Sequence, residues 1–296
     1  MANLHIDPGM NDDERRDALY RGDLIVLGPS PASRALCDFA RTMIEDAFAP
    51  QDPLHIHETL PVETCVTILA ELKPRFIHHP RAKALLQALL TEQGCAPEKT
   101  YFDVPRLRSA MPKEYLSAGI AYAFHPHRDT WYSAPVQQLN WWLPIYPLAA
   151  DNAMAFHPRY WDRPVRNSSA SYDYARWNAE SRHGAARHIK EDTRLQPRPQ
   201  EPMELEPEIR LLPPPGGLIL FSAAQMHSTV PNSTGVARYS IDFRTCHLDD
   251  LTSGRGAANC DSACTGTTIN DYLRVADLSH LPPAVIARFE ERASVS

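Results

Sequence analysis

The stretch GGLILFSAAQMHSTVPNSTGVARYSIDFR, residues 216–244, predicts two short strands separated by a turn. Residues 218–223 form an apolar run, and a second run over residues 237–245 follows a segment that contains Pro, Asn and Gly. Short runs bounded by turn residues are typical of β-strands. His227 lies just where the first of these strands ends.

Outside this stretch, most of the predicted helices come first along the chain and most of the predicted strands follow. We expect helices over residues 30–48, 62–72, 80–92 and 282–292, with Ser30 as the N-cap of the first and Pro31 in its first turn. Short strands are expected over residues 23–28, 120–124, 139–148 and 154–156. This is an α+β pattern, and many short strands favour a double-stranded β-helix, a jelly-roll or cupin-like barrel, with flanking helices.

The length of 296 residues suits a single domain with a well-buried core. We expect a helical N-terminal part over about residues 1–98, a barrel over about 99–248 and a C-terminal extension over 249–296. An insertion over about residues 159–210 interrupts the barrel. Because long connections inside a domain are commonly functional, we expect this insertion to be a mobile lid.

Composition excludes several classes of protein. The net charge of -6 and the pI near 6.1 argue against nucleic-acid binding, which needs a basic face. The longest apolar runs, residues 24–27 and 218–221, are too short to cross a bilayer, and the N-terminus does not read as a secretory signal. Six cysteines without such a signal indicate a reducing compartment. We therefore expect a cytoplasmic protein with a small-molecule substrate, no nucleic-acid or membrane partner, and an oligomeric state that the sequence leaves open.

The segment IAYAFHPHRDTWY, residues 120–132, carries the residues with metal-binding chemistry. His127 and Asp129 are two residues apart, so on an extended chain they point to the same side. With His227 they would complete a two-histidine, one-carboxylate facial triad, which holds iron(II) and leaves coordination positions open. His125 is a rival ligand, because it shares a face with His127.

The second predicted strand carries a candidate carboxylate anchor. The guanidinium of Arg238 can hold a carboxylate through two parallel hydrogen bonds, which suits a dicarboxylate co-substrate. Thr229, two residues after His227, could add a hydroxyl to the same carboxylate. Arg244 is a rival anchor, since it has the same strand parity as Arg238.

These pieces together resemble the phytanoyl-CoA dioxygenase-like branch of the 2-oxoglutarate-dependent oxygenases. The resemblance covers roughly residues 100–248 and rests on the His127-Arg128-Asp129 motif, the NAMAFH run over residues 152–157 and the stretch over residues 216–244. It implies iron(II) on His127, Asp129 and His227, with 2-oxoglutarate and O2 as co-substrates. The far carboxylate of 2-oxoglutarate would meet Arg238, with help from Thr229 or Ser240.

The resemblance implies oxidation of an unactivated C–H bond with release of succinate and CO2. Hydroxylation, desaturation and ring closure all remain open, whereas Asp129 argues against a halogenase, in which a small residue takes the carboxylate position. The family often has a Gly-Ser-His turn where this chain reads His157-Pro158-Arg159, so an acyl-CoA substrate is not carried over. Two alternatives remain: a cupin-like metalloenzyme that does not use 2-oxoglutarate, and a non-catalytic barrel that binds a ligand.

Charge within the insertion bears on the substrate. Residues 159–199 hold nine basic and five acidic side chains, a balance of +4 in a chain whose total is -6. Concentrated positive charge favours a small anionic metabolite, although the same charges could simply line a solvated face. A structural zinc site on Cys246, His247, Cys260 and Cys264 would need an unusual ligand spacing, and free thiols are the favoured interpretation.

Overall fold

The computed structural model describes residues 3–121 and 125–295, which form a mixed α/β architecture with a large and a small sheet. The large sheet has the order β1-β2-β8-β5-β10-β3-β11, and β4 also pairs with β10. Its strands are β1 (Leu4–Ile6), β2 (Leu24–Leu27), β3 (Thr100–Phe102), β4 (Arg106–Ala110), β5 (Leu139–Pro144), β8 (Leu218–Ser222), β10 (Arg238–His247) and β11 (Leu273–Arg274). The small sheet has the order β7-β6-β9, with β6 (Met154–Phe156), β7 (Ile209–Arg210) and β9 (His227–Thr229).

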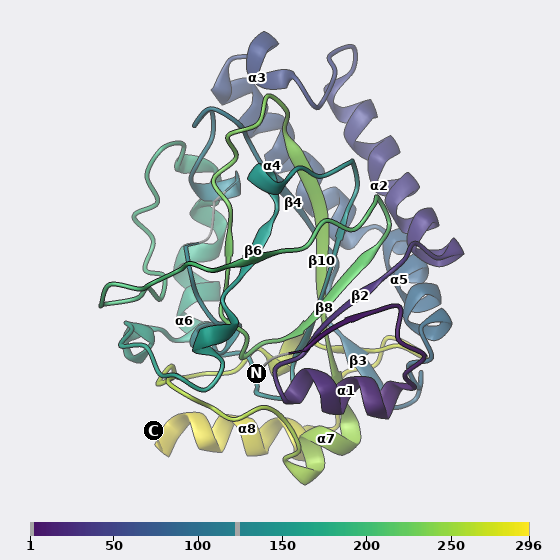
Figure 1. The fold of residues 1–296 in the computed structure, drawn as a ribbon, viewed down its shortest axis with the longest axis vertical. Helices are drawn as coiled ribbons and strands as arrows, with labels where there is room; N and C mark the ends of the chain where they lie inside the picture. Colours follow the sequence, from purple (N-terminus) through teal and green to yellow (C-terminus); the bar gives the residue numbers. More distant parts are fainter. Residues whose placement is uncertain (1–2, 122–124, 296) are drawn as a thin grey trace.

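One face of the large sheet packs against helices. Alternate residues of β10, including Tyr239, Ile241 and Phe243, are fully buried in a core shared with α2 (Pro31–Phe48), α4 (Val62–His78) and α5 (Pro80–Glu92). In Figure 1, α2 and α5 lie along one side of the sheet, and the segment that follows β6 lies on the opposite side. The period of two along a strand then turns the even-numbered residues of β10 away from the helices.

The other face of the large sheet packs against the small sheet. Trp142 of β5 and Phe221 of β8 join Met154 and Phe156 of β6 in a second apolar cluster. Their burial holds the two sheets together in the same way that apolar inner faces hold β-sandwiches. Helices, large sheet and small sheet therefore form successive layers, and the candidate site lies between the two sheets.

The expected N-terminal elements are confirmed with small shifts. Ser30 caps α2, since its hydroxyl accepts from the backbone N–H of Ser33, and Pro31 opens the helix. The helix expected over residues 62–72 instead continues to His78 through Pro74. A proline inside a helix removes one hydrogen bond, and the complete burial of Phe76 in the main core offsets that loss.

Other expected elements need correction. Residues 119–121 form a 3-10 turn rather than the start of a strand, and residues 122–124 of the expected strand lie outside the described residues. The strand expected over residues 139–148 ends at Pro144, which cannot donate to a neighbouring strand. Asp129 was expected on an extended chain, but it is the first residue of a 3-10 turn, Asp129–Tyr132.

The remaining helices lie at the chain ends and in the insertion. They are α1 (Asp12–Tyr20), α3 (Ile56–Thr59), α6 (Tyr174–Arg176), α7 (Leu248–Ser253) and α8 (Pro283–Val295). Figure 1 shows α7 and α8 together below the sheets, close to α1. In the part of the chain that the structure describes, no helix combines the length and apolar character needed to span a bilayer.

Candidate metal centre

His127, Asp129 and His227 come together as predicted. One potential ligand atom from each lies within 4.8 Å of the others, and all three residues are buried. The Nε2 atoms of His127 and His227 lie 3.5 Å and 3.8 Å from Oδ1 of Asp129. Among the described residues, this is the one group of three or more His, Cys, Asp or Glu side chains with such geometry.

Backbone pairing brings the two histidines together. His127 and His227 exchange both backbone hydrogen bonds, at 2.9 Å and 3.0 Å, and their ring centroids are 4.3 Å apart. Asp129 reaches the same point from the turn that starts immediately after this bridge. The two ligand-bearing segments are thus fixed to each other by main-chain bonds, whatever their side chains bind.

Each histidine presents Nε2 to the cluster. Nδ1 of His127 lies 2.8 Å from the carbonyl oxygen of His125, and Nδ1 of His227 lies 2.9 Å from that of Gln225. A carbonyl oxygen can only accept, so Nδ1 carries the proton in both rings and Nε2 keeps its lone pair. Metal-binding histidines are commonly oriented in this way.

The charge states also suit a divalent metal. Burial lowers the pKa of His227 to about 3, so its imidazole is neutral. Burial by itself would raise the pKa of Asp129, but the charge of Arg244 and the proximity of the two histidines outweigh it and hold that pKa well below 3.8. Two neutral imidazoles and one carboxylate form the donor set of non-haem iron(II) sites with open positions.

The second oxygen of Asp129 is held by protein groups. Its Oδ2 accepts from Nε2 of Gln138 at 3.1 Å and lies 3.7 Å from Nε of Arg244. Sequence reasoning did not find Gln138, whose only signal is its strand parity with Asn140 just before β5. It considered Arg244 only as a rival co-substrate anchor and did not identify it as a neighbour of Asp129.

Arg238 and Ser240 lie on the same face of β10, turned away from the helices, and both are buried. One terminal nitrogen of Arg238 donates to the carbonyl of Asn152 at 3.2 Å, and its guanidinium lies 5.6 Å from the ring centroid of Trp142. Nε of Arg238 and Oγ of Ser240 have no hydrogen-bond partner among the described residues. Buried polar atoms are rarely left unpaired in proteins, so these two suit a bound polar group.

Nearby carboxylates distinguish the two candidate arginines. The guanidinium of Arg244 lies 3.2 Å from Asp242, 3.4 Å from Asp103 and 3.7 Å from Asp129. Within the described part of the chain, no carboxylate lies within 4.0 Å of the guanidinium of Arg238. Burial accordingly lowers the pKa of Arg238 to about 10. Of these two arginines, Arg238 is therefore the one without a directly bound carboxylate among the described residues.

Arg238 and Thr229 both lie near the start of β6. The guanidinium of Arg238 lies against Asn152 and Ala153, just before β6. In the small sheet, Thr229 pairs with Met154 and His227 pairs with Phe156. Moving along β6 thus leads from Arg238, past Thr229, to the metal cluster.

The rival ligands lie elsewhere. The ring of His125 interacts through Nε2 with the carbonyl of Pro197 at 2.8 Å, in the insertion. The cysteines of the proposed zinc alternative are free thiols, and Cys246 is buried in an apolar cluster with Leu251 and Tyr272. In the described ranges, these residues form no second metal-ligand group.

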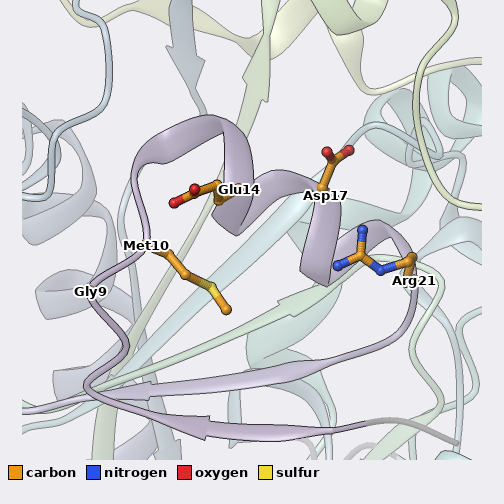
Figure 2. Close-up of a pocket in the computed structure, with 5 residues that line it drawn as sticks. All are labelled: Gly9, Met10, Glu14, Asp17 and Arg21. Carbon is orange, nitrogen blue, oxygen red and sulfur yellow. The ribbon is translucent and has the colours of Figure 1, made fainter.

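A shallow surface depression beside α1 is separate from the cluster. Figure 2 shows its lining, Gly9, Met10, Glu14, Asp17 and Arg21, which all belong to one short stretch of chain. Its charged side chains are surface groups, and Asp17 pairs with Arg255. It contributes nothing to the candidate metal centre.

No known family model matches the sequence, and no curated protein matches it significantly. Among solved structures, EvdO2 from Micromonospora carbonacea var. aurantiaca complexed with 2-oxoglutarate is similar, with a TM-score of 0.45 and 13% identity over 81% of this chain and 92% of that one. The epimerase SnoN in complex with Fe3+, alpha ketoglutarate and nogalamycin RO gives a TM-score of 0.40 and 15% identity over 80% and 85%. The non-heme monooxygenase ThoJ gives 0.38 and 13% over 89% and 86%. At such TM-scores and identities, none of these similarities assigns a fold or a function to the chain.

Proposed function

We propose that the protein is an iron(II)- and 2-oxoglutarate-dependent dioxygenase. The observation that carries this proposal is the pairing of two features between the sheets. One is a buried His127-Asp129-His227 cluster that presents two Nε2 atoms and one carboxylate oxygen. The other is a buried arginine, Arg238, without a counter-charge beside an unpaired serine hydroxyl.

The residues fit the proposed metal and co-substrate. His127, Asp129 and His227 would hold iron(II), and their number leaves positions for other ligands. Arg238 would take the far carboxylate of 2-oxoglutarate, with Ser240 and Thr229 as hydroxyl donors, because the unpaired Nε and Oγ both need a partner. With O2, the bound iron and co-substrate would supply oxidation of an unactivated C–H bond, with release of succinate and CO2.

The surrounding residues would prepare this site rather than react. Gln138 and Arg244 hold Oδ2 of Asp129, which leaves Oδ1 directed at the two histidines. Phe221, whose ring centroid is 4.8 Å from that of His227, and Phe156 exclude water from one side of the cluster. We propose that the two sheets form the double-stranded β-helix of this enzyme class, with the site inside it.

We further propose that the substrate is a small anion. Strand parity places Arg106 and Arg108 of β4 on the same face as Arg238 and Arg244. With Asp103, Asp129 and Asp242, these groups give four positive and three negative charges, and 4 - 3 = +1. The charges of iron(II) and the 2-oxoglutarate dianion cancel, so one positive charge remains for a substrate anion.

The insertion contributes less charge than its composition indicates. Over its full length, residues 159–210, it holds ten basic and nine acidic side chains, a balance of only +1. Several of its arginines pair with these acids, such as Arg159 with Glu204 and Arg210 with Glu208. We therefore assign recognition of the anion to the arginines between the sheets. Hydroxylation, desaturation and ring closure are all compatible with this arrangement.

Anaerobic titration tests the proposal. Iron(II) should bind with one equivalent per chain, and addition of 2-oxoglutarate should then produce the visible charge-transfer band of an iron(II)–ketoacid complex. His227→Ala should lose both signals, and His125→Ala should keep them. Iron binding without a ketoacid band would favour the cupin-like alternative. A ketoacid band without succinate release in oxygen, across a panel of small anionic metabolites, would favour a non-catalytic barrel. Absence of iron binding would overturn the proposal.

A further inference from the structure

The residues on either side of Asp129 are held by the C-terminal extension, residues 249–296. This segment follows β10 and lies outside both sheets except for the short strand β11. The side chains of Asp261 and Tyr272 in this segment are buried, and they contact the turn that carries Asp129 and the nearby Gln138. Their contacts form two separate links, one to the carboxylate of Asp129 and one to the turn that carries it.

The first link runs from Tyr272 through Gln138. The Tyr272 hydroxyl donates to Oε1 of Gln138 at 2.7 Å, and Nε2 of Gln138 donates to Oδ2 of Asp129 at 3.1 Å and to Asn140 at 2.8 Å. Tyr272 and Gln138 are only 1% and 3% exposed, so water does not compete for these bonds. Because the carboxylate of Asp129 can only accept, the amide N–H groups of Gln138 must face it, and Oε1 is left to accept from the Tyr272 hydroxyl.

The second link runs from Asp261 to the turn itself. Its carboxylate accepts from Nε1 of Trp131 at 2.7 Å, from Nε of Arg128 at 3.1 Å and from the backbone N–H of Val165 at 2.9 Å. Arg128 also donates to the carbonyl of Ala224 at 2.6 Å. Residues immediately before and shortly after Asp129 are thereby tied to the insertion and to the chain that leads to His227.

Such support is needed because Asp129 lies in a 3-10 turn and not in a strand. A sheet fixes the direction of its side chains through its ladder of hydrogen bonds, whereas a short turn lacks that ladder. An unsupported carboxylate could rotate and exchange its two oxygens at the metal. Groups that orient a metal ligand in this way commonly change metal affinity by about 10-fold to 100-fold when they are removed.

We infer that the C-terminal extension is part of the metal centre, with Tyr272 and Asp261 as positioning residues for Asp129. This inference rests on the proposed metal site and goes beyond it, because it assigns a role to a segment outside the two histidine-bearing strands. Neither residue touches the metal. Tyr272 acts through Gln138, and Asp261 acts through Arg128 and Trp131.

Cobalt(II), followed by its visible d–d absorption, is the probe for the test. Tyr272→Phe and Asp261→Asn should each weaken cobalt(II) binding by about 10-fold or more and alter the band shape. Tyr174→Phe is the matched control: it removes a tyrosine hydroxyl that bonds Asp271 in the same extension, without a link to Asp129. The control should bind cobalt(II) within about twofold of the unchanged protein. Apo-protein unfolding temperatures identify any variant that fails to fold.

A double-mutant cycle separates positioning from general destabilisation. If Tyr272 acts through Gln138, Tyr272→Phe should have no further effect on cobalt(II) affinity in a Gln138→Met background. Equal effects of Tyr272→Phe in both backgrounds, or no effect in either, would overturn the Tyr272 link. Failure of the unchanged protein to bind cobalt(II) would instead remove the proposed metal site itself. If Asp261→Asn does not fold, the Tyr272 cycle still decides the inference.

Discussion

Replacement of Arg238 by Met tests the co-substrate site. It should weaken the binding of 2-oxoglutarate but should not destabilise the protein. Methionine keeps an unbranched side chain over Trp142 but cannot pair with a carboxylate. Charge-assisted hydrogen bonds contribute about 1.5–3 kcal/mol, so the dissociation constant for 2-oxoglutarate should rise roughly 10-fold to 100-fold. Metal affinity should stay unchanged, because in the described part of the chain Arg238 makes no hydrogen bond or ion pair with His127, Asp129 or His227 and donates instead to the carbonyl of Asn152.

The second effect concerns the protein without ligand. Burial lowers the pKa of Arg238 from 12.5 to about 10, which corresponds to roughly 3 kcal/mol of penalty on its charged form. Loss of the hydrogen bond to Asn152 should lower the free energy of unfolding by about 1 kcal/mol. The free energy of unfolding of the apo protein should therefore stay constant or increase in Arg238→Met.

Calorimetry with cobalt(II)-loaded protein measures the first effect, and urea unfolding of the apo protein measures the second. Arg244→Met is the comparison, because Arg244 lies against Asp129 and should change metal affinity first. A variant Arg238→Met that loses more than about 2 kcal/mol of stability while keeping its 2-oxoglutarate affinity would refute the reasoning, and Arg238 would then be a structural residue.

Three further changes test the site and the core. Asp129→Ala should abolish cobalt(II) binding while the apo protein still folds; retained binding in a titration would remove Asp129 from the ligand set. Leu220→Ala should cost about 2–5 kcal/mol in urea unfolding, because Leu220 is 0% exposed in the main core, whereas exposed Leu212→Ala should cost little. Desolvation lowers the pKa of Lys73 from 10.5 to about 7, so the unfolded chain binds more protons between these values and stability should rise with pH across that window. Lys73→Met should flatten this rise, and an unchanged slope would show that Lys73 is charged in the folded state.

The juxtaposition of His127, Asp129 and His227 could be predicted from the sequence because their spacing follows from local geometry. His127 and Asp129 are close along the chain, and His227 follows a strand whose end the apolar run marks. The direct backbone bridge between His127 and His227 confirms that these segments are neighbours. Local geometry did not reveal that Asp129 begins a 3-10 turn instead of lying on an extended chain. Its carboxylate still reaches the two histidines from this turn.

The supporting residues could not be predicted, because their partners are distant in the chain. Gln138, Tyr272 and Asp261 belong to separate segments, and none lies in a motif with a fixed spacing. Side chains such as these show their role only when the fold brings donors and acceptors together. Arg128 is a similar case. Its position between His127 and Asp129 gave no indication of its own role, but its guanidinium binds the insertion and the C-terminal extension.

Arg238 and Arg244 show why strand parity alone left the co-substrate anchor open. Both lie on the same face of β10, so periodicity treats them alike. The structure separates them by their neighbours, because Arg244 meets Asp103 and Asp242 whereas Arg238 meets backbone carbonyls and the ring of Trp142. A buried cation that already has carboxylate partners stabilises the scaffold. A buried cation without one leaves an energetic cost that an anionic ligand can relieve on binding. The arginine that the folded chain leaves without a counter-charge is therefore the one on which co-substrate affinity should depend.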